Sequence, residues 1–253
     1  MKTVQLLSAL LVLAAAGLCR PDPAASAESK TTGTPRERYE ALVKEYEEAR
    51  KDFSAAYDKA RNDAERAKLH YPQPEEFSGR FLALAKEQPG GEIAAEALAW
   101  VASECRQGKD RDGSLELLLK DHLQSTNLEE VARSMRYHSR SEATERWLRA
   151  VWKDSPHHSI KGWAAYSLAA ALNSGAGAAE AEKLLEDVAA NYADVKGYRS
   201  TLADMAKGDL FELHHLAIGM TAPDIDGEDV EGRKFKLSDY RGKVVVIDFW
   251  GDW

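Results

Sequence analysis

Three groups of side chains in the sequence are of types that perform chemistry in proteins. The first group is a pair of cysteines, the second is two pairs of adjacent histidines, and the third is a carboxylate close to two tryptophans. They are Cys19 and Cys105, His157-His158 and His214-His215, and Asp248 with Trp250 and Trp253. Whether each group can perform chemistry depends on the helices, strands and terminal segment that position it.

The first residues have the pattern of a secretory signal. Lys2 supplies a positive charge, the apolar run Leu6–Leu18 follows, and Ala25-Ser26-Ala27 is a small-x-small cleavage site before Glu28. The apolar run is too short to span a bilayer, which favours cleavage over a membrane anchor. We therefore predict a signal peptide over residues 1–27 and a protein exported to the periplasm or another extracytoplasmic space.

Lipid attachment is the alternative for this leader. Ala16-Gly17-Leu18-Cys19 is similar to a lipoprotein cleavage box, but Leu18 stands where a small residue is needed. Only lipidation at Cys19 would make a membrane a partner of the protein.

Cys105 remains as a single thiol once the signal is removed, so it can form neither an internal disulfide nor a redox dithiol. It lies in register with Ala94, Ala97, Leu98 and Val101 on one helical face, which favours a buried apolar role over a reactive thiol.

The paired histidines are poor metal ligands. Adjacent side chains on a helix point about 100° apart, so neither pair converges on one ion as a zinc or copper site requires. We expect solvated histidines, no metal and no cofactor.

Composition narrows the class of protein. The chain of 253 residues has a formal net charge of −8 and 30% charged residues, which describes an acidic protein of one or two domains. A nucleic-acid binder needs a basic surface, so that class is disfavoured.

The first half of the chain predicts helices. After a flexible lead-in over residues 28–35, residues 36–71 predict one long helix, helical over Arg36–Lys68 and ended by Tyr71-Pro72-Gln73-Pro74. Its apolar residues alternate at spacings of four and three, as in a heptad seam. Packing on the rest of the domain is favoured over pairing with another chain. The seam residues are Leu42, Tyr46, Ala49, Phe53, Ala56 and Ala60.

Residues 75–215 predict a helical-repeat domain. Three helical pairs begin near Glu92, Asn127 and Ser159, which are 35 and 32 residues apart, a spacing typical of stacked repeats. The predicted helices are Phe77–Glu87, Ile93–Arg106, Ser114–Leu123, Leu128–Tyr137, Ser141–Trp152, Ile160–Asn173, Ala178–Tyr192 and Ser200–Leu213. The third pair resembles a tetratricopeptide repeat, although Ala193 replaces the usual closing proline.

The pattern changes after Leu216. Ile218–Pro223 predicts a linker and first strand, Val230–Phe235 predicts a hairpin with Gly232 at its turn, and Ser238-Asp239-Tyr240 can form a helical turn. The run Val244–Phe249 is apolar on both faces, which predicts a strand in the middle of a covered sheet.

These motifs resemble the start of exported thioredoxin-like proteins of the TlpA and AhpC/TSA redoxin type. They are Gly219-x-x-Ala222-Pro223, Gly232-x-x-Phe235-x-Leu237-Ser238-Asp239 and Arg241-Gly242-Lys243-Val244-Val245-Val246-Ile247-Asp248-Phe249-Trp250. The resemblance covers residues 216–253. It implies an incomplete α/β thioredoxin-like domain, which with the predicted helices gives a mostly α chain, a tetratricopeptide-like domain followed by this domain. It also implies thiol–disulfide exchange or peroxide reduction, with a disulfide-bearing protein or a peroxide as substrate.

The resemblance also assigns roles at the end of the sequence. It aligns Asp248 with a buried carboxylate that assists proton transfer, and Trp250 and Trp253 with tryptophans that flank the active site. The sequence departs from the family because it contains no Cys-x-x-Cys. No catalytic residue is therefore present in the chain itself.

Two explanations of this departure remain open. The sequence is a fragment or degenerate gene product, or the next codon is a UGA that encodes selenocysteine. The DNA after codon 253 distinguishes them, since UAA or UAG, or no cysteine codon three positions later, excludes selenocysteine. A different class of function also remains open, namely a non-catalytic scaffold whose helical repeats bind a partner.

Overall fold

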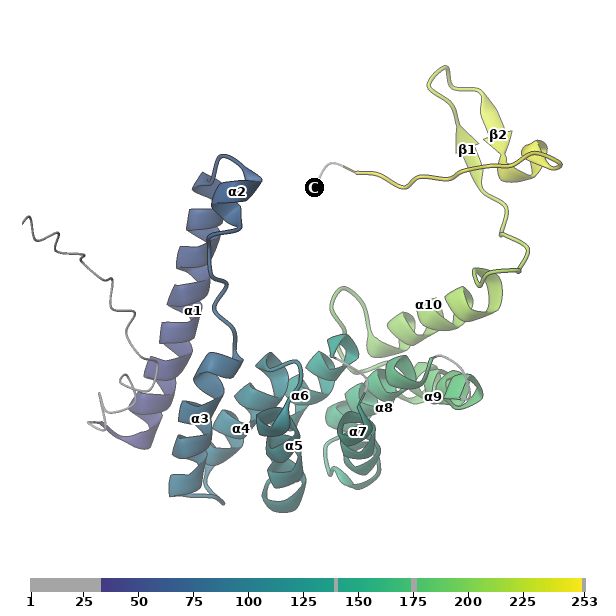
Figure 1. Ribbon diagram of the computed structural model, residues 1–253. Helices are drawn as coiled ribbons and strands as arrows, with labels where there is room; N and C mark the ends of the chain where they lie inside the picture. Colours follow the sequence, from purple (N-terminus) through teal and green to yellow (C-terminus); the bar gives the residue numbers. More distant parts are fainter. Residues whose placement is uncertain (1–32, 139–140, 174–176, 252–253) are drawn as a thin grey trace, which may run out of the picture.

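The computed structural model describes residues 33–138, 141–173 and 177–251. Most of these residues are helical, which confirms the predicted mostly α class (Figure 1). The helices are α1 Pro35–Lys59, α2 Asp63–Arg66, α3 Glu75–Glu87, α4 Glu92–Glu104, α5 Lys109–Asp121, α6 Leu128–Ser134, α7 Glu142–Asp154, α8 His158–Leu172, α9 Ala178–Asn191 and α10 Leu202–His215, with a 3-10 turn η2 at Met135–Tyr137. The predicted signal peptide, residues 1–27, lies outside the described residues.

Helix α1 begins at a capping box and packs along α3 and α4. The Thr34 hydroxyl accepts from the Glu37 amide at 3.3 Å, and the Glu37 carboxylate accepts from the Thr34 amide at 2.8 Å. Buried Tyr46 lies edge-on to the rings of Phe77 and Trp100, with centroids 5.2 Å apart in each case. The seam predicted in this helix therefore packs within the protein at Tyr46.

The long helix predicted as far as Lys68 is interrupted after Lys59. Ala60 has extended backbone angles, and the Asn62 side chain accepts from the Glu65 amide at 3.0 Å, which starts the short helix α2. An asparagine at this position satisfies a free amide of a new helix, and so it competes with continuation of the old one.

Many of the helices from α3 to α10 pack against a neighbour in sequence. Close pairs include α3 with α4, α7 with α8, α8 with α9, and α9 with α10. Helices two apart also meet, as α4 does with α6 and α6 with α8. The tetratricopeptide-like repeat stays a prediction, whereas side-by-side stacking of the helices is plain in Figure 1.

Large side chains fill the space between these helices. Trp147, Trp163 and Phe81 are fully buried, and Arg111 is also buried, with only 1% of its surface exposed. The Arg111 guanidinium donates to the Thr144 hydroxyl at 2.8 Å, which offsets part of the cost of burying a charge.

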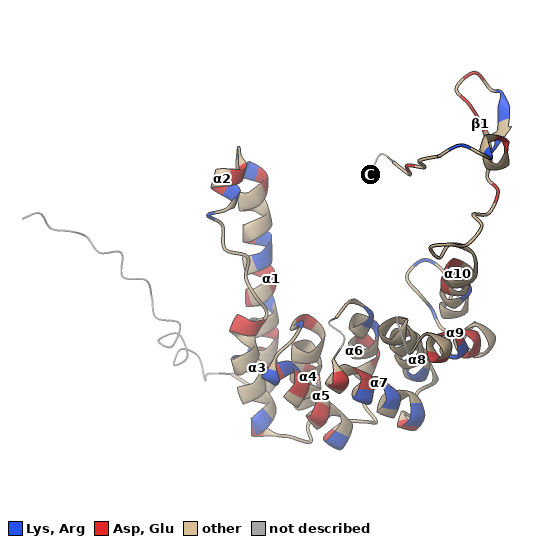
Figure 2. Cartoon of the chain, turned by 45° about the vertical axis from the view of Figure 1, so that its right-hand side comes forward, with Lys and Arg blue, Asp and Glu red and all other residues tan. Residues whose placement is uncertain are grey.

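Positively and negatively charged residues are interspersed along α1 and the other helices (Figure 2). No helix in the described part of the chain is long and apolar enough to cross a membrane.

A small β-hairpin lies beyond the end of α10, away from the helical stack (Figure 1). Strand β1, Asp226–Glu228, pairs antiparallel with strand β2, Lys234–Lys236, in a register that sets Gly227 opposite Phe235. The 3-10 turn η4, Leu237–Tyr240, follows directly.

Candidate functional site

The hairpin turn forms where the sequence predicts it, around Gly232. The Asp229 carboxylate accepts from the Glu231 amide at 3.0 Å and from the Arg233 amide at 2.9 Å. These hydrogen bonds, with the Arg233 backbone contributing most, lower the pKa of Asp229. Gly232 adopts a φ of 78°, which a residue without Cβ reaches at little cost.

The segment before the hairpin is held by a carboxylate and not by strand pairing. Asp224 accepts from both the amide and the hydroxyl of Ser238 at 2.8 Å, and these hydrogen bonds lower the pKa of Asp224. The first strand predicted within Ile218–Pro223 does not form. In the described chain its backbone has no neighbouring strand with which to make a ladder.

The run Val244–Phe249 is also not a strand, and the prediction of a buried central strand is wrong for this structure. Val244 is 98% exposed, Val246 90% and Phe249 80%. A central strand needs a strand on each side and cover on both faces. The described sheet contains β1 and β2, which pair with each other.

The predicted site residues are consequently not assembled. Asp248 is exposed, so the burial that would make it a proton-transfer group is missing here. Trp250 is 85% exposed and flanks no described site, and Trp253 lies outside the described residues.

Cys105 is fully buried, as its helical register predicts. Burial, together with the neighbouring carboxylates of Glu75 and Asp110, raises the pKa of its thiol to about 12. Because the thiolate is the nucleophile, this cysteine is inert in the folded protein.

The paired histidines bind different partners. His157 Nε2 lies 2.8 Å from the carbonyl oxygen of Gln124, and His158 Nε2 lies 3.2 Å from an Asp194 oxygen. His214 Nε2 is 2.7 Å from a Glu182 oxygen. Within the described residues no three ligating side chains gather around a point that could hold a metal ion.

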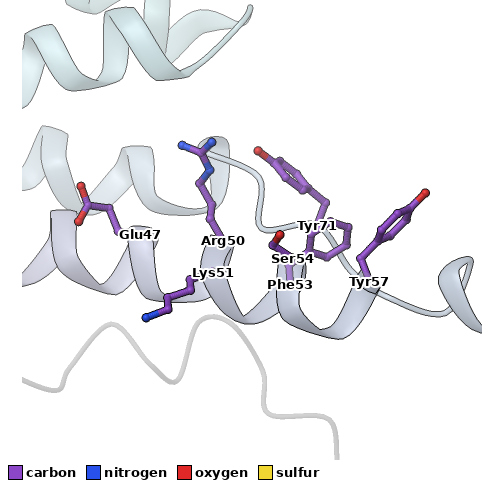
Figure 3. A pocket seen from close by; sticks show the side chains of 7 residues that line it. All are labelled: Glu47, Arg50, Lys51, Phe53, Ser54, Tyr57 and Tyr71. Carbon is purple, nitrogen blue, oxygen red and sulfur yellow. The ribbon is translucent and has the colours of Figure 1, made fainter. Parts of the chain in front are cut away.

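A pocket on α1 is a feature that the sequence does not single out. It has a volume of about 450 Å³ and is formed by α1 and Tyr71 of the following loop. Tyr71 lies edge-on to Phe53, with centroids 5.1 Å apart. Figure 3 shows the polar ends of Arg50 and Tyr71 on the same side of the pocket, with Lys51 directed away from them.

Arg50 and Tyr71 also line a second pocket, of about 470 Å³, which reaches Glu104, Arg106 and His138. Burial, followed by the nearby charges of Arg111 and Arg106, lowers the pKa of His138 to about 4. The second pocket thus combines fixed cations and carboxylates with a histidine held neutral. In the sequence, Tyr-Pro-Gln-Pro at residues 71–74 predicts only the end of a helix. The closeness of Tyr71 to His138 could not be predicted, because it depends on the tertiary fold.

Comparison with curated proteins matches a short part of the chain. "Thiol-disulfide oxidoreductase ResA" of Geobacillus thermodenitrificans (strain NG80-2) is 55% identical over 38 residues, which are 15% of this chain and 22% of that protein. The protein of that name from Geobacillus kaustophilus (strain HTA426) is 53% identical over 38 residues, with the same coverage. That of Bacillus anthracis is 38% identical over 47 residues, or 19% of this chain and 27% of the relative.

The matched stretch is similar to thioredoxin-like oxidoreductases. It is as long as the segment 216–253 on which the predicted resemblance rests. The chain spans only about a quarter or less of the length of the curated relatives it matches. No family model matches the chain, and no solved structure does.

Proposed function

We propose that this protein is an exported thioredoxin-like thiol–disulfide oxidoreductase whose redox unit begins with residues 216–253. The identity of 55% over 38 residues to a thiol–disulfide oxidoreductase carries the proposal. The hairpin around Gly232 supports it, because the turn and the following η4 have the order that the resemblance implies. The substrate would be a disulfide-bearing protein, with a peroxide as the alternative substrate.

The proposed chemistry is thiol–disulfide exchange. A thiolate attacks the substrate disulfide and forms a mixed disulfide, and a second thiol resolves it and releases the reduced substrate. In the completed unit Val244–Phe249 would be a paired strand, and Asp248 would lie beneath the thiols and exchange a proton with the resolving one. Trp250 and Trp253 would flank the reacting sulfurs.

The 253-residue chain lacks the two thiols that this exchange needs. Cys105 cannot replace them, because it is buried and the pKa of its thiol is raised to about 12. We therefore expect no turnover of insulin disulfides by the chain as given. A selenocysteine codon after Trp253 stays a prediction that the genomic sequence checks.

A chimera tests the proposal directly. Residues 216–253 replace the matched 38-residue stretch of the Geobacillus thermodenitrificans relative, which supplies the remainder of a redox unit. We expect the chimera to reduce insulin, and Asp248→Asn to lower its rate at least about tenfold, as loss of proton-transfer assistance does. Asp226→Asn in the hairpin is the control that keeps the rate. A folded chimera without activity contradicts the proposal.

A second candidate function is a non-catalytic scaffold in the helical region. The two pockets that share Arg50 and Tyr71 favour it, since binding sites are concave and combine aromatic side chains with polar groups that orient the bound molecule. Under this alternative, residues 35–215 alone should bind a partner in a pull-down as strongly as the full chain binds it. Tyr71→Ala would release the partner, and Val246→Ala would not.

A further inference from the structure

The second pocket has charged groups of both signs on its wall. Arg50 and Arg106 supply two guanidinium groups, and Glu75 and Glu104 supply two carboxylates. Its volume of about 470 Å³ lies within the range of small-molecule sites, which is about 300–1,000 Å³. We propose that this pocket binds a small zwitterion, namely an α-amino acid with an apolar side chain.

The two guanidinium groups are suited to the carboxylate of such a ligand. Every other arginine within α1–α10 has a carboxylate oxygen within 4.0 Å, whereas Arg50 forms no ion pair with a described residue. The Arg50 guanidinium lies 5.6 Å from the centroid of the Tyr46 ring, which also lines the pocket. Arg106 donates its backbone amide to Glu75 at 3.3 Å, and its guanidinium likewise has no ion pair with a described residue. A planar guanidinium without an internal counter-ion is a strong donor to a carboxylate.

The Glu104 carboxylate is suited to the ammonium group of the ligand. It is half-buried at the end of α4 and forms no ion pair within the described part of the chain. Burial, and then the charge of Glu104, raises the pKa of Tyr46, so this carboxylate lies close to a hydroxyl in the pocket wall. A carboxylate has about four acceptor positions, and one tyrosine hydroxyl leaves the others available to an ammonium group.

Two further polar atoms of the lining residues have no hydrogen-bond partner. They are Ser103 Oγ and His138 Nδ1, and both are buried. Because the pKa of His138 is lowered to about 4, chiefly by burial, its imidazole is neutral at pH 7 and has one acceptor nitrogen. A buried polar group without a partner is unfavourable, so a ligand that carries N–H donors would relieve this cost.

The rest of the wall indicates an apolar side chain and excludes ligands with a single kind of charge. Tyr46, Tyr71 and Pro74 contribute rings to the pocket. A phosphate or a dicarboxylate would face carboxylates such as Glu104, and a simple amine would face guanidinium groups such as that of Arg50. Like charges that face each other weaken binding, whereas a zwitterion can pair with both signs.

This inference uses no thiol and no residue after α10, so it is independent of the proposed redox chemistry. An inactive chimera and a protein that binds no amino acid would be separate results.

Isothermal titration calorimetry tests the proposal, with protein expressed from the full 253-codon sequence and with L-phenylalanine and L-leucine as probes. We expect at least one of them to bind with a dissociation constant below about 1 mM. Its analogues without the ammonium or without the carboxylate should bind at least about tenfold more weakly, because each leaves one sign of charge in the pocket unpaired. For phenylalanine these analogues are 3-phenylpropionate and phenethylamine.

Variants of the lining residues locate the binding. Arg50→Gln and Arg106→Gln should each raise the dissociation constant of the amino acid at least about tenfold, since each removes a charged partner of its carboxylate. Glu104→Gln should weaken the amino acid equally but should not weaken the analogue that has no ammonium group. A variant that merely disturbs the fold would weaken both.

Arg61→Gln is the matched control, because it makes the same change at an exposed arginine that lines neither pocket. It should leave the dissociation constant unchanged, and circular dichroism should show equal helix content in all variants. Absence of binding by both amino acids overturns the inference. So does an analogue without the ammonium that binds as tightly as the amino acid, or an equal loss in Arg50→Gln and Arg61→Gln.

Discussion

The helical region and the C-terminal segment of this chain have similar apolar side chains in opposite surroundings. In the helical region Trp163 on α8 and Leu168 on the same helix are fully buried. In the C-terminal segment Trp250 is 85% exposed and Val244 98%. The difference does not lie in how apolar the residues are. It lies in where their packing partners come from.

Helical stacks obtain their partners locally. Each helix from α3 to α10 packs against a helix one or two places away along the chain, so apolar periodicity within a short stretch is enough to build a core. The Val244–Phe249 run needs strands from elsewhere, because a central strand is paired on both edges. A two-stranded hairpin such as β1 and β2 has too few strands to pair with the Val244–Phe249 run on both edges, and too little apolar surface to cover it.

Matched tryptophan substitutions test this comparison with the largest expected effect. Trp163→Ala leaves a cavity in the core and should lower the free energy of unfolding by about 3–5 kcal/mol. Trp250→Ala removes a solvated ring and should change it by less than about 0.5 kcal/mol. Urea denaturation followed by circular dichroism, at low protein concentration, measures both. Equal losses would show that the C-terminal segment packs as tightly as the helices do.

The pH dependence of the free energy of unfolding gives a second test of this comparison, and it depends on His138. Burial lowers the pKa of His138 to about 4 from the ordinary 6.5, so the unfolded chain binds a proton first as the pH falls. The free energy of unfolding should therefore fall between about pH 6.5 and pH 4, by up to about 3 kcal/mol, and this contribution should level off below pH 4.

His138→Gln removes the titrating group, so the fall over this pH range should be smaller by that amount. Urea denaturation at several pH values measures the slope of each protein. A variant with the slope of the parent would mean that His138 does not titrate differently in the folded protein. Such a result would mean that burial in the helical region does not shift the pKa of His138, and the helical region would then differ less from the solvated C-terminal segment.

The sequence predicts the helices well, because their signals lie within single elements. Phe77–Glu87 and Leu128–Tyr137 appear nearly as predicted, with the last turn of the second one in 3-10 form. The predicted helix bounds are wrong where a residue that caps a new helix competes with continuation of the helix before it, as Asn62 does after α1. Helix α5 likewise begins at Lys109, ahead of the predicted Ser114, and follows Gly108 at a φ of 105°.

The candidate sites are less predictable, since they depend on residues far apart in the sequence. The hairpin could be predicted because Gly232 and its neighbours carry the whole signal. The burial of Asp248 could not, because it requires strands that the described chain does not place beside it. The pocket that joins Arg50 to His138 is equally invisible in the sequence, as no local pattern connects α1 with the turn after α6.

Glycine-to-alanine substitutions give the smallest expected changes in the free energy of unfolding. They distinguish a tightly packed position from one on the open surface. A Cβ on Gly162 of α8 would lie 2.5 Å from Tyr192 Cδ1 and 3.0 Å from Leu202 Cδ2, and both side chains are buried. Gly162→Ala should therefore lower the free energy of unfolding by about 1–3 kcal/mol. In the hairpin, a Cβ on Gly227 would meet the end of the Phe235 ring at 2.9 Å.

Phe235 is only half-buried and can turn aside, so Gly227→Ala should leave the helical unfolding transition within about 0.5 kcal/mol of the parent. Gly208→Ala on α10 is the control for helix propensity, because nothing lies within 4 Å of the new Cβ. It should stabilise the protein by about 0.5–1 kcal/mol. If Gly162→Ala stabilised the protein as Gly208→Ala does, the close contact between α8 and Tyr192 would be absent. The helical region would then be more loosely packed than its buried side chains indicate.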